Sequence, residues 1–481
     1  MNDRRGALWR KWDLHIHTPE SITHRYSGPR GAQWSRFLDE LEALPPEFKV
    51  IGINDYVLID GYKRVLAEKR NGRLANIDLI LPVIELRLDM FAGTGGHLSR
   101  VNLHVIFSDG VTPETIETQF LSALPKRYKL SPEVGDVPWS AIPNRSSLLE
   151  LGQMILRSTP AEKRADRDPV EIGFNSITFS LDKIRDVLDC HYFRDKHLVA
   201  VGKTEWAAMR WEGQGVAEKK SLINSADLIF TAAESPQACI DARKKLEADG
   251  VNDRLLDCSD AHAFMDSADK DRIGNCFTWV KADTTFAGLC QALREYRARV
   301  YLGEAPPKLG IVKASGSRFI RSVSIRKKEM SDCRETWFDS ELDLNHDLVA
   351  IIGRKGSGKS ALTDVIGLLC DAKREKSFSF LNPKRFRDPK ENKSKSFVGR
   401  LQFETGPELE RGLDAPVDST EPARANYIPQ SFFEELCGEI VRGEDSAFQK
   451  ELEDVVFARL PAAQRLGFAT LRELVALGQT K

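Results

Sequence analysis

The sequence lacks the features that mark secreted, disulfide-bonded and membrane-spanning proteins. None of its eight cysteines belongs to a Cys-x-x-Cys pair, which argues against a disulfide framework or a zinc ribbon and favours reduced thiols. The first five residues, Met-Asn-Asp-Arg-Arg, begin no apolar segment of the kind found in secretory signals. No apolar run approaches the ~18 residues that span a bilayer. These absences predict a soluble cytoplasmic protein with no membrane partner.

Excess charge of either sign is also absent, because 70 basic residues stand against 71 acidic ones. Near neutrality excludes an overall argument for nucleic-acid binding, so only local charge can supply one. The length of 481 residues exceeds that of most single domains, and at least two domains are expected.

Short apolar runs alternate with amphipathic, helix-like stretches from Lys11 to about Gly303. This alternation predicts an α/β fold with buried parallel strands, and the number of repeats indicates a barrel. The expected helices include 34–43, 113–124, 180–188 and 236–249. The expected strands are Trp12–His17, Val50–Ile53, Leu79–Leu86, Asn102–Phe107, Leu198–Gly202, Asp227–Phe230 and Leu255–Cys258.

The first expected strand contains a His-x-His motif. Successive side chains of a strand face opposite ways, so His15 and His17 share one face with Asp13. Imidazole commonly binds zinc, iron and manganese, and a nearby acid can orient its free nitrogen. Taken alone, the motif is equally well explained as a chance pair on a surface strand.

Most of the expected strands also deliver a carboxylate or an imidazole at or near the carboxyl end, where barrel enzymes carry their chemistry. Each such residue has a simpler explanation when taken singly, such as a helix cap or a hydrogen-bonded core histidine. Their recurrence at successive strands predicts a metal site instead. The candidate ligands are His15, His17, Asp55, Glu85, His104, Glu205, Asp260 and His262.

This pattern resembles the PHP (polymerase and histidinol phosphatase) family over roughly residues 10–303. The resemblance implies a distorted (βα)7 barrel that holds two or three zinc, manganese or iron ions and hydrolyses phosphate esters. It also implies that Glu85 bridges to a second ion shared with His104, and that His262 belongs to a third. The residues that it implies at the first metal, and as the catalytic set, are His15, His17, Glu85 and Asp260.

The chain departs from the family at several of these positions. Tyr56 stands where the family has the imidazole of a Thr-Asp-His triplet. The ligand after the fifth strand is expected to be Glu205, with His191 as the alternative. His24 stands where some members place a ligand of the third metal. We therefore expect a dinuclear rather than a trinuclear site.

A second domain is expected after the proline-rich connector 304–308. The apolar run Leu348–Ile352 predicts a buried strand, and it is followed by Gly-x-x-x-x-Gly-Lys-Ser and a helical segment, the context of a P-loop. Backbone N–H groups at the helix N-terminus would bind phosphates, Lys359 would reach the β and γ phosphates, and Ser360 would bind Mg²⁺. The expected ATP-binding residues are Gly353, Lys355, Gly356, Ser357, Gly358, Lys359, Ser360 and, further along, Gln430.

Residues 426–432 resemble the Q-loop of ABC-type and SMC-like ATPase heads, in which a glutamine contacts the metal. The segment Phe397–Phe403 is similar to the antiparallel strands that precede the Q-loop in those heads. The heads also need a signature motif and a Walker B strand, and residues 431–481 contain neither. We therefore expect a domain at 317–481 that is the N-terminal half of such a head, joined by a linker at 304–316 to a PHP domain at 1–303. A further segment or a partner subunit would complete it, and homo-oligomers would form through the heads.

A basic stretch lies within the second domain. Residues 371–400 carry ten lysines or arginines against four acidic residues. Such a stretch can contact nucleic-acid phosphates, although a solvated insertion has the same composition.

The combination of domains resembles the TrlF-type PHP–ATPase family. The resemblance implies an ATP-regulated, metal-dependent nuclease or phosphoesterase that hydrolyses phosphodiester bonds of DNA or RNA by a metal-activated water. Its implied setting is bacterial antiphage defence or DNA repair. Two alternatives stay open: a small-molecule phosphatase with a regulatory ATPase, and an inactive PHP scaffold on a DNA-binding clamp.

Overall fold

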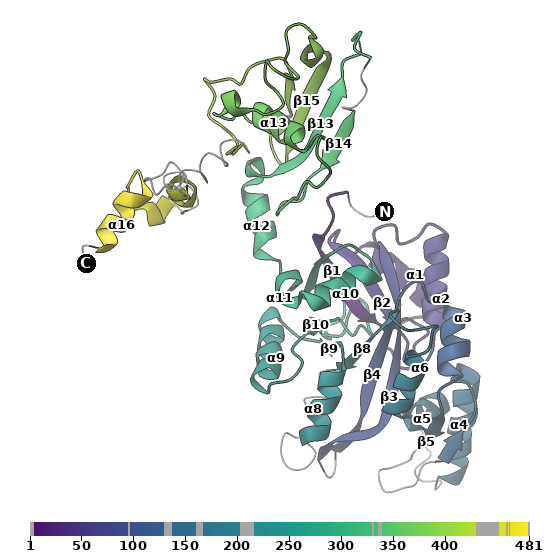
Figure 1. Cartoon of the computed structure of the whole chain (residues 1–481). Helices are drawn as coiled ribbons and strands as arrows, with labels where there is room; N and C mark the ends of the chain where they lie inside the picture. The colour runs from purple at the N-terminus through teal and green to yellow at the C-terminus, as the bar shows by residue number, and fades with distance from the viewer. Residues whose placement is uncertain are drawn as a thin grey trace. The chain divides into compact units, whose positions relative to one another are not determined.

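The computed structural model divides the chain into two compact units, residues 1–310 and 311–481, which are called the N-terminal and C-terminal units below. Figure 1 shows the elements of each unit. No helix in the described part of the chain is long and apolar enough to cross a lipid bilayer. The described residues are 4–94, 97–128, 137–159, 167–202, 216–329, 331–334, 339–429, 452–457, 460 and 462–479.

The N-terminal unit is built on a 12-stranded sheet whose main path runs β10-β9-β8-β4-β3-β2-β1-β11-β12. All seven strands expected from the sequence are confirmed in this path. Three short strands, β5 (Lys126–Tyr128), β6 (Val137–Trp139) and β7 (Ile177–Phe179), join the sheet beside β3. The strands of the main path are β1 (Leu8–Ile16), β2 (Phe48–Asn54), β3 (Leu79–Thr94), β4 (His97–Phe107), β8 (His197–Gly202), β9 (Leu228–Thr231), β10 (Leu255–Asp257), β11 (Thr278–Ala282) and β12 (Val300–Leu302).

The strand directions differ from the all-parallel arrangement that the sequence predicts. β1, β2 and β3 pair in parallel, as do β8, β9 and β10, but β4 is antiparallel to both of its neighbours, β3 and β8. Only two residues separate Thr94 at the end of β3 from His97 at the start of β4. Parallel neighbours need a crossover of about a dozen or more residues, so β3 and β4 form a hairpin, which Figure 1 shows as a long ribbon.

The sheet is nearly closed where the end of β1 meets the segment that follows β10. Ile16 and Ala261 form a parallel bridge, and the N–H of His17 donates to the carbonyl of Ala261 at 3.0 Å. The first half of β1 pairs instead with β11, in the antiparallel direction. This closure places the carboxyl ends of β1 and β10 side by side, and it gives the unit a mixed α/β fold with a barrel-like sheet.

Helices form between the strands where apolar residues recur at helical spacing. In α1 (Arg30–Glu42) the residues Trp34, Phe37, Leu38 and Leu41 are buried, at positions i, i+3, i+4 and i+7 of one helix face. Helices are present in all four of the segments named from the sequence, and the segment at 113–124 begins with a short α-helix that a π-helical turn, Ile116–Leu121, extends. The other helices up to residue 314 are α2 (Asp60–Arg70), α3 (Pro113–Thr115), α4 (Arg145–Ser158), α5 (Pro169–Ser176), α6 (Leu181–Leu188), α8 (Val216–Ser225), α9 (Pro236–Ala248), α10 (Phe286–Arg294), α11 (Tyr296–Arg299) and α12 (Pro307–Ala314).

The C-terminal unit contains a separate antiparallel sheet of order β14-β13-β15-β16. Its core joins Val323 of β13 and Phe397 of β15 to Val365 and Leu369 of a helix, α13. β15 confirms the strand expected at 397–403. The elements are β13 (Ile320–Lys327), β14 (Ser340–Asp343), α13 (Lys359–Leu369), β15 (Phe397–Phe403), β16 (Leu409–Gly412) and, near the end, α16 (Leu471–Gln479).

The prediction of a buried strand at 348–352 is wrong. These residues form no strand, and Leu348 and Ile352 have 94% and 89% of their surface exposed. The four strands of the C-terminal sheet pair with one another, and none of the described strands pairs with this segment. A strand needs a neighbour to satisfy its backbone N–H and C=O groups, so an apolar run alone does not make one.

Candidate metal centre

β1 and the residue after it hold two imidazoles on the side of the strand opposite its buried apolar side chains. His15 lies within β1, and His17 follows the last residue of the strand. The ring Nδ1 of His17 lies 3.1 Å from Ser21 Oγ, and its backbone N–H is bonded to Ala261. Both imidazoles are therefore held in place, although only one of them belongs to the strand.

His15, Glu85 and His104 form the first group of potential metal ligands, and all three are buried. Glu85 Oε2 lies 3.6 Å from His15 Nε2 and 3.4 Å from His104 Nε2. The sequence predicts a strand that ends at Leu86, next to Glu85, and that end is wrong: β3 continues to Thr94, and His104 of β4 stands directly opposite Glu85. The β3–β4 hairpin thus supplies two of the three potential ligands of this group.

His15, His17 and Asp260 form a second group. His15 Nε2 lies 3.0 Å from His17 Nε2 and 3.2 Å from Asp260 Oδ1, and His17 Nε2 lies 3.5 Å from the same oxygen. Asp260 has a φ of 49°, a left-handed conformation that aspartate adopts more readily than most residues. Because His15 belongs to both groups, the two lie side by side.

The charges of these groups depend strongly on one another. Burial would raise the pKa of Glu85, but the imidazoles of His104 and His15 outweigh it and hold that pKa well below its usual value. Burial opposes the positive charge of His15, yet Asp260 and Glu85 raise its pKa to about 9. Burial, together with the charge of His262, lowers the pKa of His17 to about 3. Burial also opposes the charge of Asp260, but His15 and the neighbouring imidazoles hold its pKa below the usual value. Glu85 and Asp260 are therefore both negative at neutral pH.

The donor set fits a metal ion. Both ring nitrogens of His104 are buried without a hydrogen-bond partner, whereas buried polar atoms nearly always have one. A divalent cation would supply a partner for one of these nitrogens and would balance the negative charges of Glu85 and Asp260. Imidazole and carboxylate are ligands that zinc, iron and manganese accept. These buried groups could therefore hold a metal ion.

Two asparagines that contact Glu85 were not predicted from the sequence as residues of the site. Asn54 Nδ2 donates to Glu85 Oε2 at 2.9 Å and lies 2.6 Å from His15 Nε2. Asn102 Nδ2 donates to Glu85 Oε1 at 2.7 Å. Their signals are positional: Asn54 is the last residue of β2, and Asn102 lies two residues before His104 on the same face of β4. A search for acids and imidazoles alone does not find amide side chains.

Asp55 was expected to bind metal but belongs to neither group. Its two carboxylate oxygens accept hydrogen bonds from the N–H and the hydroxyl of Thr18, both at 2.7 Å. Burial raises the pKa of Asp55 to about 7. The residue ties the segment after β1 to the end of β2, which accounts for an acid at this position without a metal.

His262 and Tyr56 lie beside the two groups rather than in them. The His262 ring stacks on that of His17, with centroids 3.9 Å apart. Its Nδ1 lies 2.7 Å from the Asp260 carbonyl oxygen and donates to it, and its Nε2 lies 3.0 Å from the Tyr56 hydroxyl. Burial raises the pKa of Tyr56 far above its usual value, so its hydroxyl keeps the proton. Among the described residues, these two side chains do not form a further ligand group.

Two further candidates, His191 and His24, belong to neither group. Glu205 lies outside the described residues. His191 precedes β8, whereas the candidate ligands lie along β1, β3 and β4 and after β10. Its ring centroid lies 3.9 Å from that of Tyr192, with the two rings tilted by 37°. His24 Nδ1 accepts the N–H of Tyr26 at 3.2 Å, within the segment after β1.

A cavity of about 520 Å³ opens onto the candidate ligands. Two basic side chains, Arg87 and Lys270, line it together with Tyr56 and Asn102. The Arg87 guanidinium lies 4.2 Å from the centre of the Phe174 ring, a cation–π contact that fixes its plane. The cavity therefore combines negative ligands on one part of its wall with cationic groups on another.

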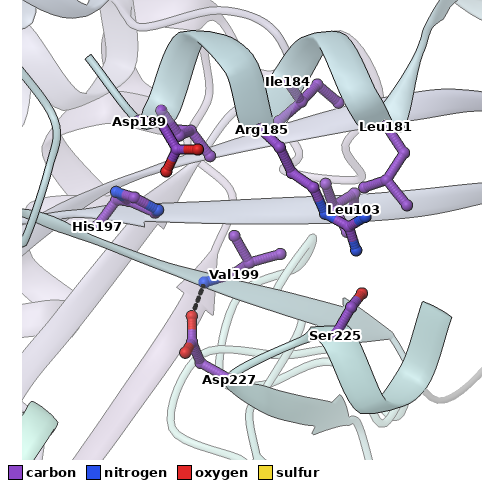
Figure 2. Close-up of a pocket in the computed structure, with 10 residues that line it drawn as sticks. Leu103, Leu181, Ile184, Arg185, Asp189, His197, Val199, Ser225 and Asp227 are labelled. Carbon is purple, nitrogen blue, oxygen red and sulfur yellow. Dashed lines mark hydrogen bonds between the residues drawn. The ribbon is translucent and has the colours of Figure 1, made fainter. Parts of the chain in front are cut away.

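A smaller cavity of about 200 Å³ lies on the other face of β4 (Figure 2). It is lined by Leu103, whose neighbour on the strand is His104, and successive side chains of a strand face opposite ways. Figure 2 shows Asp227 accepting the N–H of Val199, at 2.8 Å. Neither of the ligand groups found among the described residues opens into this cavity.

The P-loop motif follows the exposed segment 348–352 and leads into α13. Gly356 and Gly358 have φ of 86° and 90°, values that favour glycine. Lys359 Nζ donates to the carbonyls of Gly353 and Arg354, each at 2.8 Å. The lysine thus contacts its own loop, and Gln430 lies outside the described residues.

The chain matches no protein-family model, and no curated protein matches its sequence significantly. Its function must therefore be inferred from the groups in the cavity.

Proposed function

We propose that this protein is a metal-dependent phosphoesterase that hydrolyses phosphodiester bonds of nucleic acid. The observation that carries the proposal is the convergence of His15, His17, Glu85, His104 and Asp260 on one cavity that arginine and lysine also line. A site that hydrolyses a phosphate ester needs groups that bind a metal cation and, beside them, groups that bind the anionic phosphate. The resemblance of the sequence motifs to PHP phosphoesterases supports the same reaction class.

The ligand side chains would hold one or more divalent cations, with Mn²⁺, Zn²⁺ and Fe²⁺ as candidates. Glu85 and His104 would contribute to one position, and His17 and Asp260 to another. His15 would bind at one of the two, since one imidazole nitrogen coordinates a single ion. When bound, such cations neutralise phosphate charge and activate water for in-line displacement. Asn54 and Asn102 orient Glu85, since each donates to one of its oxygens.

The cationic residues of the cavity would bind the substrate. Arg87 presents a planar guanidinium that can donate two hydrogen bonds to a phosphate group. Lys270 adds a second positive charge on the wall of the same cavity. The Tyr56 hydroxyl, which keeps its proton, also lies on that wall, 3.0 Å from His262 Nε2.

The C-terminal unit would regulate this activity by binding ATP with Mg²⁺. Its Gly-Arg-Lys-Gly-Ser-Gly-Lys-Ser motif and the left-handed glycines Gly356 and Gly358 support a phosphate-binding loop. Lys359 would exchange its two carbonyl partners for phosphate oxygens. By its resemblance to ABC and SMC-like heads, this unit would act with a second head, and the setting would be bacterial antiphage defence or DNA repair.

The direct test is a nuclease assay on the full chain. We expect cutting of end-labelled DNA or RNA that depends on Mn²⁺ and responds to ATP. His15→Ala and Asp260→Ala should abolish the cutting, because each removes a ligand. His191→Ala is the matched control: its ring contacts that of Tyr192 and it belongs to neither ligand group, so the variant should cut normally.

Other outcomes of the same assay would contradict the proposal. Turnover of p-nitrophenyl phosphate or mononucleotides without cutting of polymers would indicate a small-molecule phosphatase. A purified protein that contains no transition metal by elemental analysis, and that binds none when metal is supplied, would indicate a scaffold.

A further inference from the structure

Three arginines from three helices converge on the segment that follows β1. Arg30 of α1 forms an ion pair with the Glu20 carboxylate, and Arg64 of α2 has its Nη1 3.9 Å from Glu20 Oε1. Arg145, the first residue of α4, donates from Nη2 to the Glu20 carbonyl at 2.9 Å. We call Arg30, Arg64 and Arg145 the arginine cluster. None of the three lines the cavity of the candidate metal centre.

The cluster is held in place by buried groups. The Arg64 guanidinium lies 4.2 Å from the centre of the Trp34 ring, and Trp34 is fully buried. Trp34 Nε1 donates in turn to Glu20 Oε1 at 3.2 Å. Stacking on the indole orients the plane of the guanidinium, so less conformational freedom is lost when it binds an anion.

The cluster is next to the metal centre along the chain and in space. Glu20 and Ser21, whose backbone carbonyls Arg145 contacts, lie just after His17, and Ser21 Oγ is 3.1 Å from the His17 ring. Burial lowers the pKa of His24, and the charges of Arg145, His262 and Arg30 lower it further. The His24 imidazole is therefore close enough to interact electrostatically with both the arginine cluster and His262.

The cluster carries more positive charge than its contacts neutralise. Among the described residues, Glu20 is the carboxylate that Arg30 and Arg64 share, and Arg145 contacts only the uncharged carbonyls of Glu20 and Ser21. The side chains of Arg30 and Arg64 are 61% and 44% exposed, whereas that of Glu20 is only 16% exposed. Each guanidinium has five donors, of which one carboxylate and two carbonyls use a small part. The unused donors point to an oxygen-rich anion.

We infer that the arginine cluster is a second phosphate-binding site, which takes a backbone phosphate of a DNA or RNA strand while a neighbouring phosphodiester lies at the metal centre. This inference rests on the proposed function and deepens it, because it names a polynucleotide as the substrate. A phosphomonoester or a mononucleotide lacks the second phosphodiester that would occupy the cluster.

The test compares two substrates in the full chain. Bis(p-nitrophenyl) phosphate presents one phosphodiester, and labelled single-stranded DNA and RNA oligonucleotides present many. In Arg30→Gln/Arg64→Gln/Arg145→Gln, oligonucleotide kcat/KM should fall by about tenfold or more, the loss expected for hydrogen bonds between charged groups. Hydrolysis of bis(p-nitrophenyl) phosphate should stay within about twofold. The DNA and RNA arms identify which polymer is preferred.

Binding gives a readout that does not depend on bound metal. Fluorescence anisotropy with the metal-free protein should show weaker oligonucleotide binding in the triple variant. The slope of log affinity against log salt should fall by about 1 for each phosphate that the variant no longer binds. The corresponding triple lysine variant should keep part of the affinity, since it keeps the charge.

A matched control replaces three exposed arginines outside the cluster, Arg185, Arg254 and Arg297, with glutamine, and it should bind and cut as the parent does. If the cluster variant binds oligonucleotides with unchanged affinity and salt slope, the inference is wrong. It is also wrong if both substrates lose turnover equally in a variant with an unchanged circular dichroism spectrum. If the parent hydrolyses neither substrate, the proposed function fails, and the anisotropy data still decide on the anion site.

Discussion

Glu85 and His104 stand directly opposite each other on the antiparallel strands β3 and β4, with Glu85 Oε2 3.4 Å from His104 Nε2. The pair is local to one hairpin, whereas its third partner, His15, comes from β1. Asn54 and Asn102 donate to the two oxygens of Glu85 from β2 and β4. The carboxylate is thus held by four side chains from three strands, and several predictions depend on this arrangement.

Removal of the Asn102 amide should weaken metal binding without unfolding the protein. Asn102→Ala leaves Glu85 Oε1 without its donor, and loss of a group that orients a metal ligand typically costs about 10–100-fold in affinity. Competition with a fluorescent chelator measures the change for Mn²⁺. Asn252→Ala is the control, since its amide bonds the carbonyl of Ala226 at 2.6 Å, away from the cavity. Equal affinities in the two variants would contradict the assigned role.

Metal binding should strengthen as pH rises toward about 9. The negative charges of Asp260 and Glu85 raise the pKa of His15 to about 9, so its imidazole carries a proton at neutral pH that a metal ion must displace. His17, with a pKa of about 3, has no proton to lose. Affinity for Mn²⁺ should therefore increase about tenfold per pH unit between about pH 6 and 8. Calorimetric titration under anaerobic conditions measures it, and a flat profile would exclude His15 as a ligand.

Replacement of Tyr56 by histidine should let the site bind one more metal ion per chain. Tyr56 has a φ of 60°, which histidine adopts more readily than bulky residues, so the backbone accepts the change. Its hydroxyl lies 3.0 Å from His262 Nε2, and its ring centroid lies 4.6 Å from that of His17. A second imidazole would thus stand beside His262. Elemental analysis after dialysis against Mn²⁺ should show the gain, and Tyr56→Phe should show none.

A methyl group at position 52 should destabilise the N-terminal unit. The Cβ of Ala in Gly52→Ala would lie 2.4 Å from the Leu14 carbonyl oxygen, so β1 and β2 would have to separate. Overpacking of this kind costs about 1–3 kcal/mol. Urea unfolding followed by tryptophan fluorescence measures the free energy of unfolding. Gly31→Ala in α1 is the control, because its Cβ meets nothing within 4 Å and should be neutral or slightly stabilising.

Loss of the Lys359 ammonium should weaken nucleotide binding. Lys359 Nζ now contacts the carbonyls of Gly353 and Arg354, and phosphate oxygens would replace them. Lys359→Ala should raise the dissociation constant for a fluorescent ATP analogue by about tenfold or more, because it removes a charged hydrogen bond. Lys384→Ala, an exposed position outside the loop, should bind as the parent does. Unchanged binding in Lys359→Ala would argue against a P-loop in this unit.

The strands could be predicted because their signal is local. Trp12, Leu14 and Ile16 alternate with polar residues, and each of the other expected strands is a short apolar run bounded by breaks. All seven are present. The run 348–352 has the same composition and is not a strand, because no described strand pairs with it. Composition thus indicates that a segment can be a strand, and a neighbour determines whether it is one.

Most of the potential metal ligands could also be predicted, because their residue types and their positions near strand ends can be read from the local sequence. His15, His17, Glu85, His104 and Asp260 were expected and are brought together. Asp55 has the same chemistry and the same position after a strand, yet Thr18 occupies both of its oxygens. Asn54 and Asn102 carry no such signal and nevertheless contact Glu85.

One physical cause separates the features that the sequence predicts from those that it does not. Alternation, helical spacing and turn residues act over a few neighbouring positions, so the chain specifies its elements and the residue types at their ends. Which end lies next to which depends on strand pairing between distant segments, such as the bridge between Ile16 and Ala261 and the hairpin that turns β4 against β3. Those pairings place the Glu85 carboxylate among imidazoles and the Asp55 carboxylate beside Thr18.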